Sequence, residues 1–145
     1  MNTFHSSVVS LGKVSFPAFG GKRIMMMPFE FHDVQGSLPD SLAEWKPVIS
    51  QLIESVGEPL EGVGYLTLDE AEVQGGETHR RPGLHVDGIG EDGKRGVWGG
   101  GGGGGGGYAK VGMILAASHT GCVAYDQTFE GMAGPNGDCE HLSDQ

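Results

Sequence analysis

The chain has 145 residues and a mass of 15.2 kDa, the size of one ordinary domain. Its net charge of −10 disfavours nucleic acid and anionic membrane surfaces as partners. Neither a secretory signal nor an apolar stretch near the ~20 residues of a membrane-spanning helix is found, so the cytoplasm is the default location.

The expected elements begin with short strands at 7–11 and 13–16, where apolar and polar residues alternate. A Met-rich apolar run at 23–31 predicts another strand, with Pro28 at an edge or a bulge.

A single helix is expected between Pro39 and Gly57, with Asp40 as its N-cap and Gly57 as its stop. Apolar residues recur there at three- and four-residue spacing, so they share one face that packs on a sheet: Leu42, Trp45, Ile49, Leu52, Ile53 and Val56. Pro47 lies inside this pattern, which leaves a kink or two abutting helices as alternatives.

The second half of the chain is expected to be mostly β. Strands are predicted at 63–73, 108–118 and 122–126, with a short extended unit at 84–87 and a loop from Gly131 onward. Glycine supplies 28 of the 145 residues and fills positions 99–107 without interruption. This run is either a flexible linker or an element packed closely against another backbone. Cys122 and Cys139 lack a paired spacing, so free thiols are expected.

The segment from Thr78 to Gly88 carries the most informative motif, His85-Val86-Asp87. In a strand, residues two apart face the same side, so the imidazole and the carboxylate would converge. Nitrogen and oxygen ligands, completed by a distant histidine, form the facial triad of non-heme Fe(II) sites. The alternative is a solvated histidine and aspartate at a strand end.

Charged residues surround this motif. Arg80 and Arg81 precede it and either attract an anionic co-substrate or balance neighbouring carboxylates. The glycines at 88, 90 and 93 match a dinucleotide-binding pattern, but two carboxylates in that loop would repel a pyrophosphate. Asp87, Glu91 and Asp92 form either a calcium-binding loop or a solvated acidic turn.

Residues 63–126, with the HxD motif of His85 and Asp87, resemble the N-terminal half of a double-stranded β-helix oxygenase that uses Fe(II) and 2-oxoglutarate. The resemblance implies one oxygenase-like domain over residues 1–145: a partial, cupin-like jelly roll, mainly β with one helix (α+β). In such enzymes a second histidine late in the barrel completes the triad, and a basic residue follows it. His141 is the candidate ligand here, although no Arg or Lys follows it; Arg80 and Arg81 are the candidates for binding 2-oxoglutarate.

The expected function is therefore Fe(II)-assisted oxidation of a substrate that the sequence does not identify. The alternative is a non-enzymatic structural or interaction subunit. About six strands cannot close an eight-stranded barrel, so an open strand edge would be covered by another chain, identical or different, or left exposed in a degenerate fold.

Overall fold

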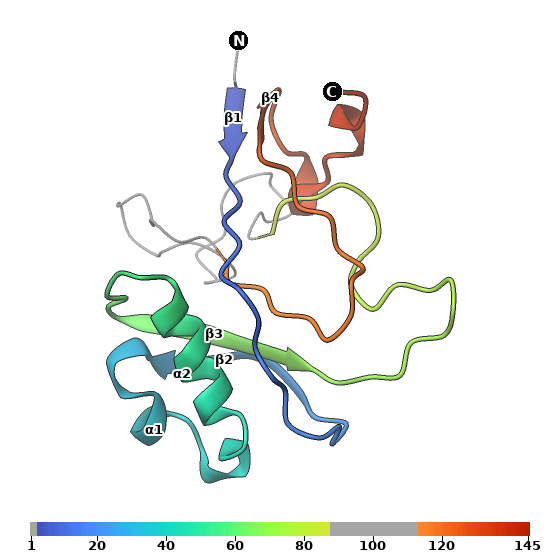
Figure 1. The fold of residues 1–145 in the computed structure, drawn as a ribbon. Coiled ribbons are helices and arrows are strands. Elements are labelled where there is room, and N and C mark those ends of the chain that lie inside the picture. Colours follow the sequence, from blue (N-terminus) through green and yellow to red (C-terminus); the bar gives the residue numbers. More distant parts are fainter. Residues whose placement is uncertain (1–2, 88–112) are drawn as a thin grey trace. The chain divides into compact units, whose positions relative to one another are not determined.

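The computed structural model describes residues 3–87 and 113–145, and shows antiparallel strands with two short α-helices (Figure 1). Its strands and helices are β1 (Thr3–Ser6), β2 (Arg23–Glu30), α1 (Val34–Ser37), α2 (Lys46–Ser55), β3 (Val63–Asp69) and β4 (Gln127–Glu130). The predicted α+β content is confirmed. None of the described helices has the length and apolar character needed to cross a membrane.

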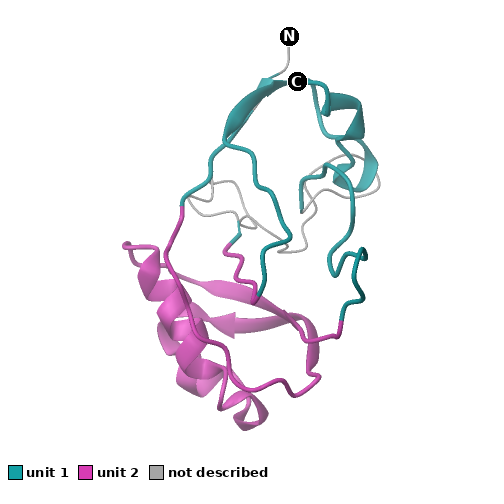
Figure 2. Cartoon of the chain, turned by 45° about the vertical axis from the view of Figure 1, so that its right-hand side comes forward, with its two compact units in different colours: residues 1–9, 73–113, 119–145 teal, residues 10–72, 114–118 magenta. Residues whose placement is uncertain are grey.

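Contacts divide the chain into two compact units (Figure 2). We call Ser10–Glu72 with Ile114–Ser118 the helical unit. We call Met1–Val9, Val73–Met113 and His119–Gln145 the HxD unit, after the motif it contains. The prediction that residues 1–145 form one oxygenase-like domain is not tested by this division and stays a prediction.

The helical unit is built on β2 and β3, which pair antiparallel from Arg23↔Asp69 to Glu30↔Val63. The register shifts between Ile24 and Met27, so the predicted strand carries its bulge just before Pro28. One face of this sheet and the helices share a core. Its buried members are Phe29, Val34, Leu38, Leu42, Trp45, Val48, Ile49 and Leu68.

The predicted helix between Pro39 and Gly57 is divided in two. A 3-10 helix spans Asp40–Leu42, and α2 begins only at Lys46, with Pro47 in its first turn. Proline has no N–H to donate and is tolerated in a first turn, which explains the break. The N-cap assigned to Asp40 is wrong, because Pro39 occupies the N-cap position of the 3-10 helix and Trp45 that of α2, and neither side chain makes a capping hydrogen bond. The alternative of two abutting helices is confirmed.

Several predicted strands are absent from the described residues. Positions 7–11, 13–16 and 113–126 contain no strand, although Phe16 still packs on Trp45 with ring centroids 5.5 Å apart. Alternating polarity produces a strand only where a second backbone supplies hydrogen bonds. The rest of the strand predicted at 108–118 lies outside the described residues.

In the HxD unit, a strand near the N-terminus pairs with a strand that lies more than 120 residues further along the chain. β1 and β4 run antiparallel from Thr3↔Glu130 to Ser6↔Gln127. Two 3-10 helices follow, at Pro135–Gly137 and Glu140–Leu142. A second core consists of buried Phe129, Cys139 and Leu142, with Leu84, Val86 and Ala133 packed against it. Both cysteines are free, as predicted.

Candidate metal half-site

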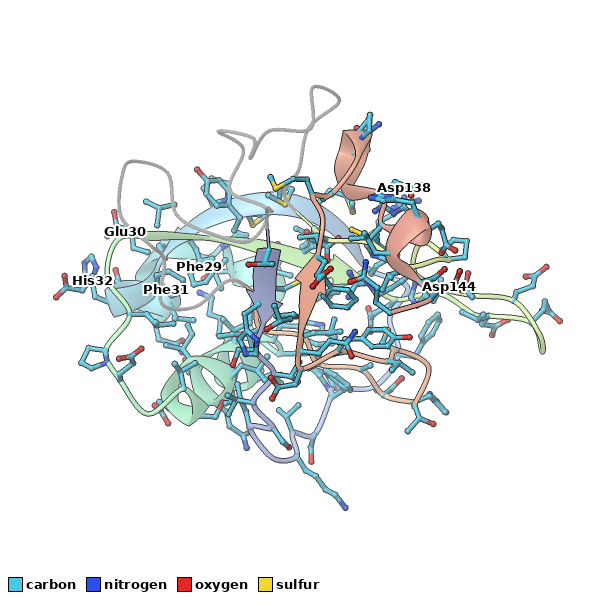
Figure 3. The ribbon with its side chains drawn as sticks, turned by 90° about the horizontal axis from the view of Figure 1, so that it is seen from above. Phe29, Glu30, Phe31, His32, Asp138 and Asp144 are labelled. Atoms are coloured by element: carbon cyan, nitrogen blue, oxygen red, sulfur yellow. The ribbon has the colours of Figure 1, made fainter. Side chains whose placement is uncertain are left out.

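The HxD segment is held by the C-terminal part of the chain. His85 forms an isolated antiparallel bridge with Asp138, which Figure 3 labels. The Val86 amide donates to the Gly137 carbonyl at 2.8 Å, and the Cys139 amide donates to the Leu84 carbonyl at 2.9 Å. Leu84 and Val86 pack on the second core. Because side chains alternate along an extended segment, His85 and Asp87 point to the face opposite the one that Leu84 and Val86 bury in this core.

His85 is fixed in one orientation. Its Nδ1 lies 2.8 Å from the Gly83 carbonyl oxygen. A carbonyl oxygen only accepts hydrogen bonds, so Nδ1 carries a hydrogen, and Nε2 is the ring nitrogen left to bind a proton or a metal ion. The side chain is 16% exposed. The ring therefore offers a metal-binding nitrogen at a partly covered position.

Asp87 directs one oxygen toward that nitrogen. Its Oδ1 lies 3.7 Å from Nε2 of His85, while its Oδ2 accepts a 2.8 Å hydrogen bond from Nη2 of Arg80. The two carboxylate oxygens thus have different neighbours. The structure therefore brings His85 and Asp87 together, as their i, i+2 spacing predicts. It also places Arg80 beside Asp87.

This donor set fits two positions of a facial triad. It consists of an imidazole nitrogen and a carboxylate oxygen, the ligand types that non-heme Fe(II) takes. Each ligand is also oriented by a second group, Gly83 or Arg80, which is typical of metal-binding histidines and carboxylates.

The third ligand stays a prediction. His141 lies in the last 3-10 helix, where its Nε2 is 3.0 Å from the Met132 carbonyl oxygen. Across residues 3–87 and 113–145 no three His, Cys, Asp or Glu side chains gather closely enough to hold a metal ion. Among the described residues the candidate ligands that lie close together therefore number two, His85 and Asp87.

A pocket of about 210 Å³ adjoins His85. It is lined by Arg81, Pro82, Gly83, Leu84, His85, Pro135, Asn136, Asp138 and Glu140. The Arg81 guanidinium donates to the Asn136 carbonyl at 2.8 Å. Of the two arginines predicted to bind 2-oxoglutarate, Arg81 therefore faces a pocket, whereas Arg80 is paired with Asp87.

No protein-family model, curated protein or solved structure matches this chain. Several predicted features lie outside the described residues: the glycine pattern at 88–93, the calcium ligands Glu91 and Asp92, and the glycine run at 99–107.

Two residues near His85 were not singled out by the sequence. The Glu140 carboxylate accepts a hydrogen bond from the Leu84 amide, 56 positions away. Gly83 adopts a positive φ of 84° beside that carboxylate. Neither position carries a local signal, because the contact depends on the long-range bridge between His85 and Asp138.

Cys139 lies next to the bridge but is not poised as a nucleophile. Burial raises the pKa of its thiol, and the neighbouring Asp138 carboxylate raises that pKa further. A thiol with a raised pKa stays protonated at neutral pH and reacts slowly. We therefore assign Cys139 to the second core.

Proposed function

We propose that this chain is an oxygenase-like metal-binding domain in which His85 and Asp87 hold a divalent cation. Fe(II) is the proposed metal, 2-oxoglutarate the proposed co-substrate, and a partial cupin-like jelly roll the proposed fold. The observation that supports this function is the approach of Nε2 of His85 to Oδ1 of Asp87, at 3.7 Å.

Electrostatics favours a cation at this position. A nitrogen lone pair and a carboxylate oxygen repel each other unless a proton or a metal ion lies between them. Here both groups are oriented by other partners, Gly83 and Arg80. A divalent cation held by His85 and Asp87 would supply the positive charge that these two groups lack in its absence.

The remaining residues complete the proposal. When bound, Fe(II) supplies the oxidative chemistry, while His85 and Asp87 leave other positions open for ligands. Arg81, which lines the pocket beside His85, is the proposed partner of a co-substrate carboxylate. Arg80 holds Asp87 with one oxygen toward the metal.

Anaerobic calorimetric titration of the full chain with Fe(II) tests this function. One equivalent should bind to the wild type, and His85→Ala and Asp87→Ala should each abolish or strongly weaken binding. His32→Ala is the matched control, because His32 pairs with Glu30 at 3.1 Å in the helical unit (Figure 3). Absence of binding, or binding undiminished in His85→Ala, refutes the proposal.

A second candidate function is that of an interaction subunit. The outward face of the β2–β3 sheet exposes Met25, Val63 and Tyr65, which are 60%, 54% and 46% exposed. Among the described residues this sheet has only two strands, and open strand edges favour pairing with another chain. Tyr65→Ser should then reduce any concentration-dependent association in sedimentation, and the wild type should bind no Fe(II).

A further inference from the structure

We propose that Glu140 is a positioning residue for His85 and acts through the single peptide unit that joins Gly83 to Leu84. This inference deepens the proposed metal-binding function and rests on it. Glu140 and His85 contact opposite ends of this one peptide unit.

The peptide unit connects the two side chains rigidly. Its N–H, from Leu84, donates to the Glu140 carboxylate. Its carbonyl, from Gly83, accepts a 2.8 Å hydrogen bond from Nδ1 of His85. Because a peptide unit is planar and its N–H and C=O point in opposite directions, fixing one end fixes the other.

The charge of Glu140 also strengthens the bond to His85. A carboxylate on the N–H polarises the amide and makes its carbonyl oxygen a better acceptor, as in other chains of hydrogen bonds. The stronger acceptor favours the neutral tautomer that carries its proton on Nδ1. The lone pair of Nε2 then faces Oδ1 of Asp87, as metal binding requires.

Local packing holds Glu140 in place. Its backbone N–H donates to Oδ1 of Asp138 at 3.0 Å, and the preceding residue, Cys139, is buried. Gly83 has a positive φ of 84°, which favours glycine, and a Cβ there would lie 2.6 Å from Oε1 of Glu140, so a larger residue would require the carboxylate to shift.

Imidazole ¹⁵N NMR of the full chain tests the tautomer without any metal. Wild-type His85 should be mainly the Nδ1–H tautomer, and Glu140→Ala should shift the population toward Nε2–H. Glu140→Gln keeps an acceptor but loses the charge, so it should lie between them. Asp144→Ala is the control, because it removes another exposed carboxylate of the C-terminal segment (Figure 3). It should leave the tautomer of His85 unchanged.

Fe(II) titration of the same variants gives the second measurement. Removing an outer partner of a metal ligand should weaken affinity about 10- to 100-fold in Glu140→Ala, and less in Glu140→Gln. An unchanged tautomer in Glu140→Ala overturns the inference. If Glu140→Ala does not fold, a Glu140→Gln variant identical to the wild type in both measurements overturns it.

The two proposals fail in different ways. A wild type that binds no Fe(II), but whose His85 tautomer shifts in Glu140→Ala, refutes the metal-binding function and leaves the positioning role of Glu140 intact. A wild type that binds Fe(II), with tautomer and affinity both unchanged in Glu140→Ala, refutes the positioning role alone.

Discussion

The Arg80 guanidinium donates a 2.8 Å hydrogen bond to Oδ2 of Asp87, seven positions further along the chain. This bond leaves Oδ1 as the carboxylate oxygen nearest to His85. The pair is also partly exposed, at 34% for Arg80 and 37% for Asp87. Its effect on orientation should therefore exceed its effect on stability.

Arg80→Ala should weaken Fe(II) binding by about tenfold, because Asp87 loses the group that orients it. The free energy of unfolding should fall by no more than about 1 kcal/mol, the usual value of an exposed ion pair. Titration calorimetry and urea denaturation measure the two effects. Arg80→Lys keeps the charge without the planar guanidinium and should be intermediate. Equal or tighter binding in Arg80→Ala contradicts this prediction.

Arg81→Ala should reduce the affinity of the Fe(II)-loaded chain for 2-oxoglutarate more than Arg80→Ala does. Arg81 lines the pocket beside His85 and donates to a neutral carbonyl, that of Asn136, whereas Arg80 is already paired with the Asp87 carboxylate. Anaerobic calorimetry with 2-oxoglutarate on both variants provides the comparison. The reverse order would show that the pocket is not the co-substrate site.

Leu42→Ala should destabilise the helical unit by about 2–5 kcal/mol, because Leu42 is 1% exposed at the centre of its core. Leu52→Ala is the matched control and should cost less, since Leu52 is only partly buried at the edge of that core. Thermal unfolding followed by circular dichroism measures both. Equal losses would mean that Leu52 is covered by something besides this core.

The two cysteines should differ in reactivity. Exposed Cys122 should react with a thiol reagent at once, whereas buried Cys139 should react only as the structure opens. Timed labelling of Cys122→Ser and Cys139→Ser separates the two thiols. Fast labelling of Cys122→Ser would contradict the assignment of Cys139 to the second core.

The raised pKa of Cys139 also sets the sign of a pH effect. The folded state holds the thiol proton more tightly than the unfolded chain does. The thiol proton therefore adds to the free energy of unfolding. This stabilisation is complete below the pKa of the thiol in the unfolded chain, and it is lost as the pH rises through the pKa of the thiol in the folded state. Cys139→Ser should lack this alkaline loss in a series of denaturation curves.

The sequence predicted the features that depend on local order. The strand at 23–31 and the end of the helix near Gly57 follow from spacing, and both are close to the observed bounds. Pro47 also marked the position where one helix becomes two. Likewise, the proximity of His85 and Asp87 follows from two-residue alternation alone.

Features that depend on distant pairing were not predictable in this way. β4 forms at 127–130 rather than at 122–126 because it pairs with β1, across nearly the whole chain. Val123, in the segment predicted as a strand, is 77% exposed. The hydrogen bond between Glu140 and the Leu84 amide depends on the same kind of long-range contact.

The division into units has a consequence for biosynthesis. The helical unit is nearly continuous in sequence, from Ser10 to Glu72, whereas the HxD unit combines three separate segments. Domains fold as the ribosome releases them, in order from the N-terminus. The helical unit can therefore fold early. The backbone bridge and the hydrogen bonds around His85 can form only after Asp138 and Glu140 have been translated.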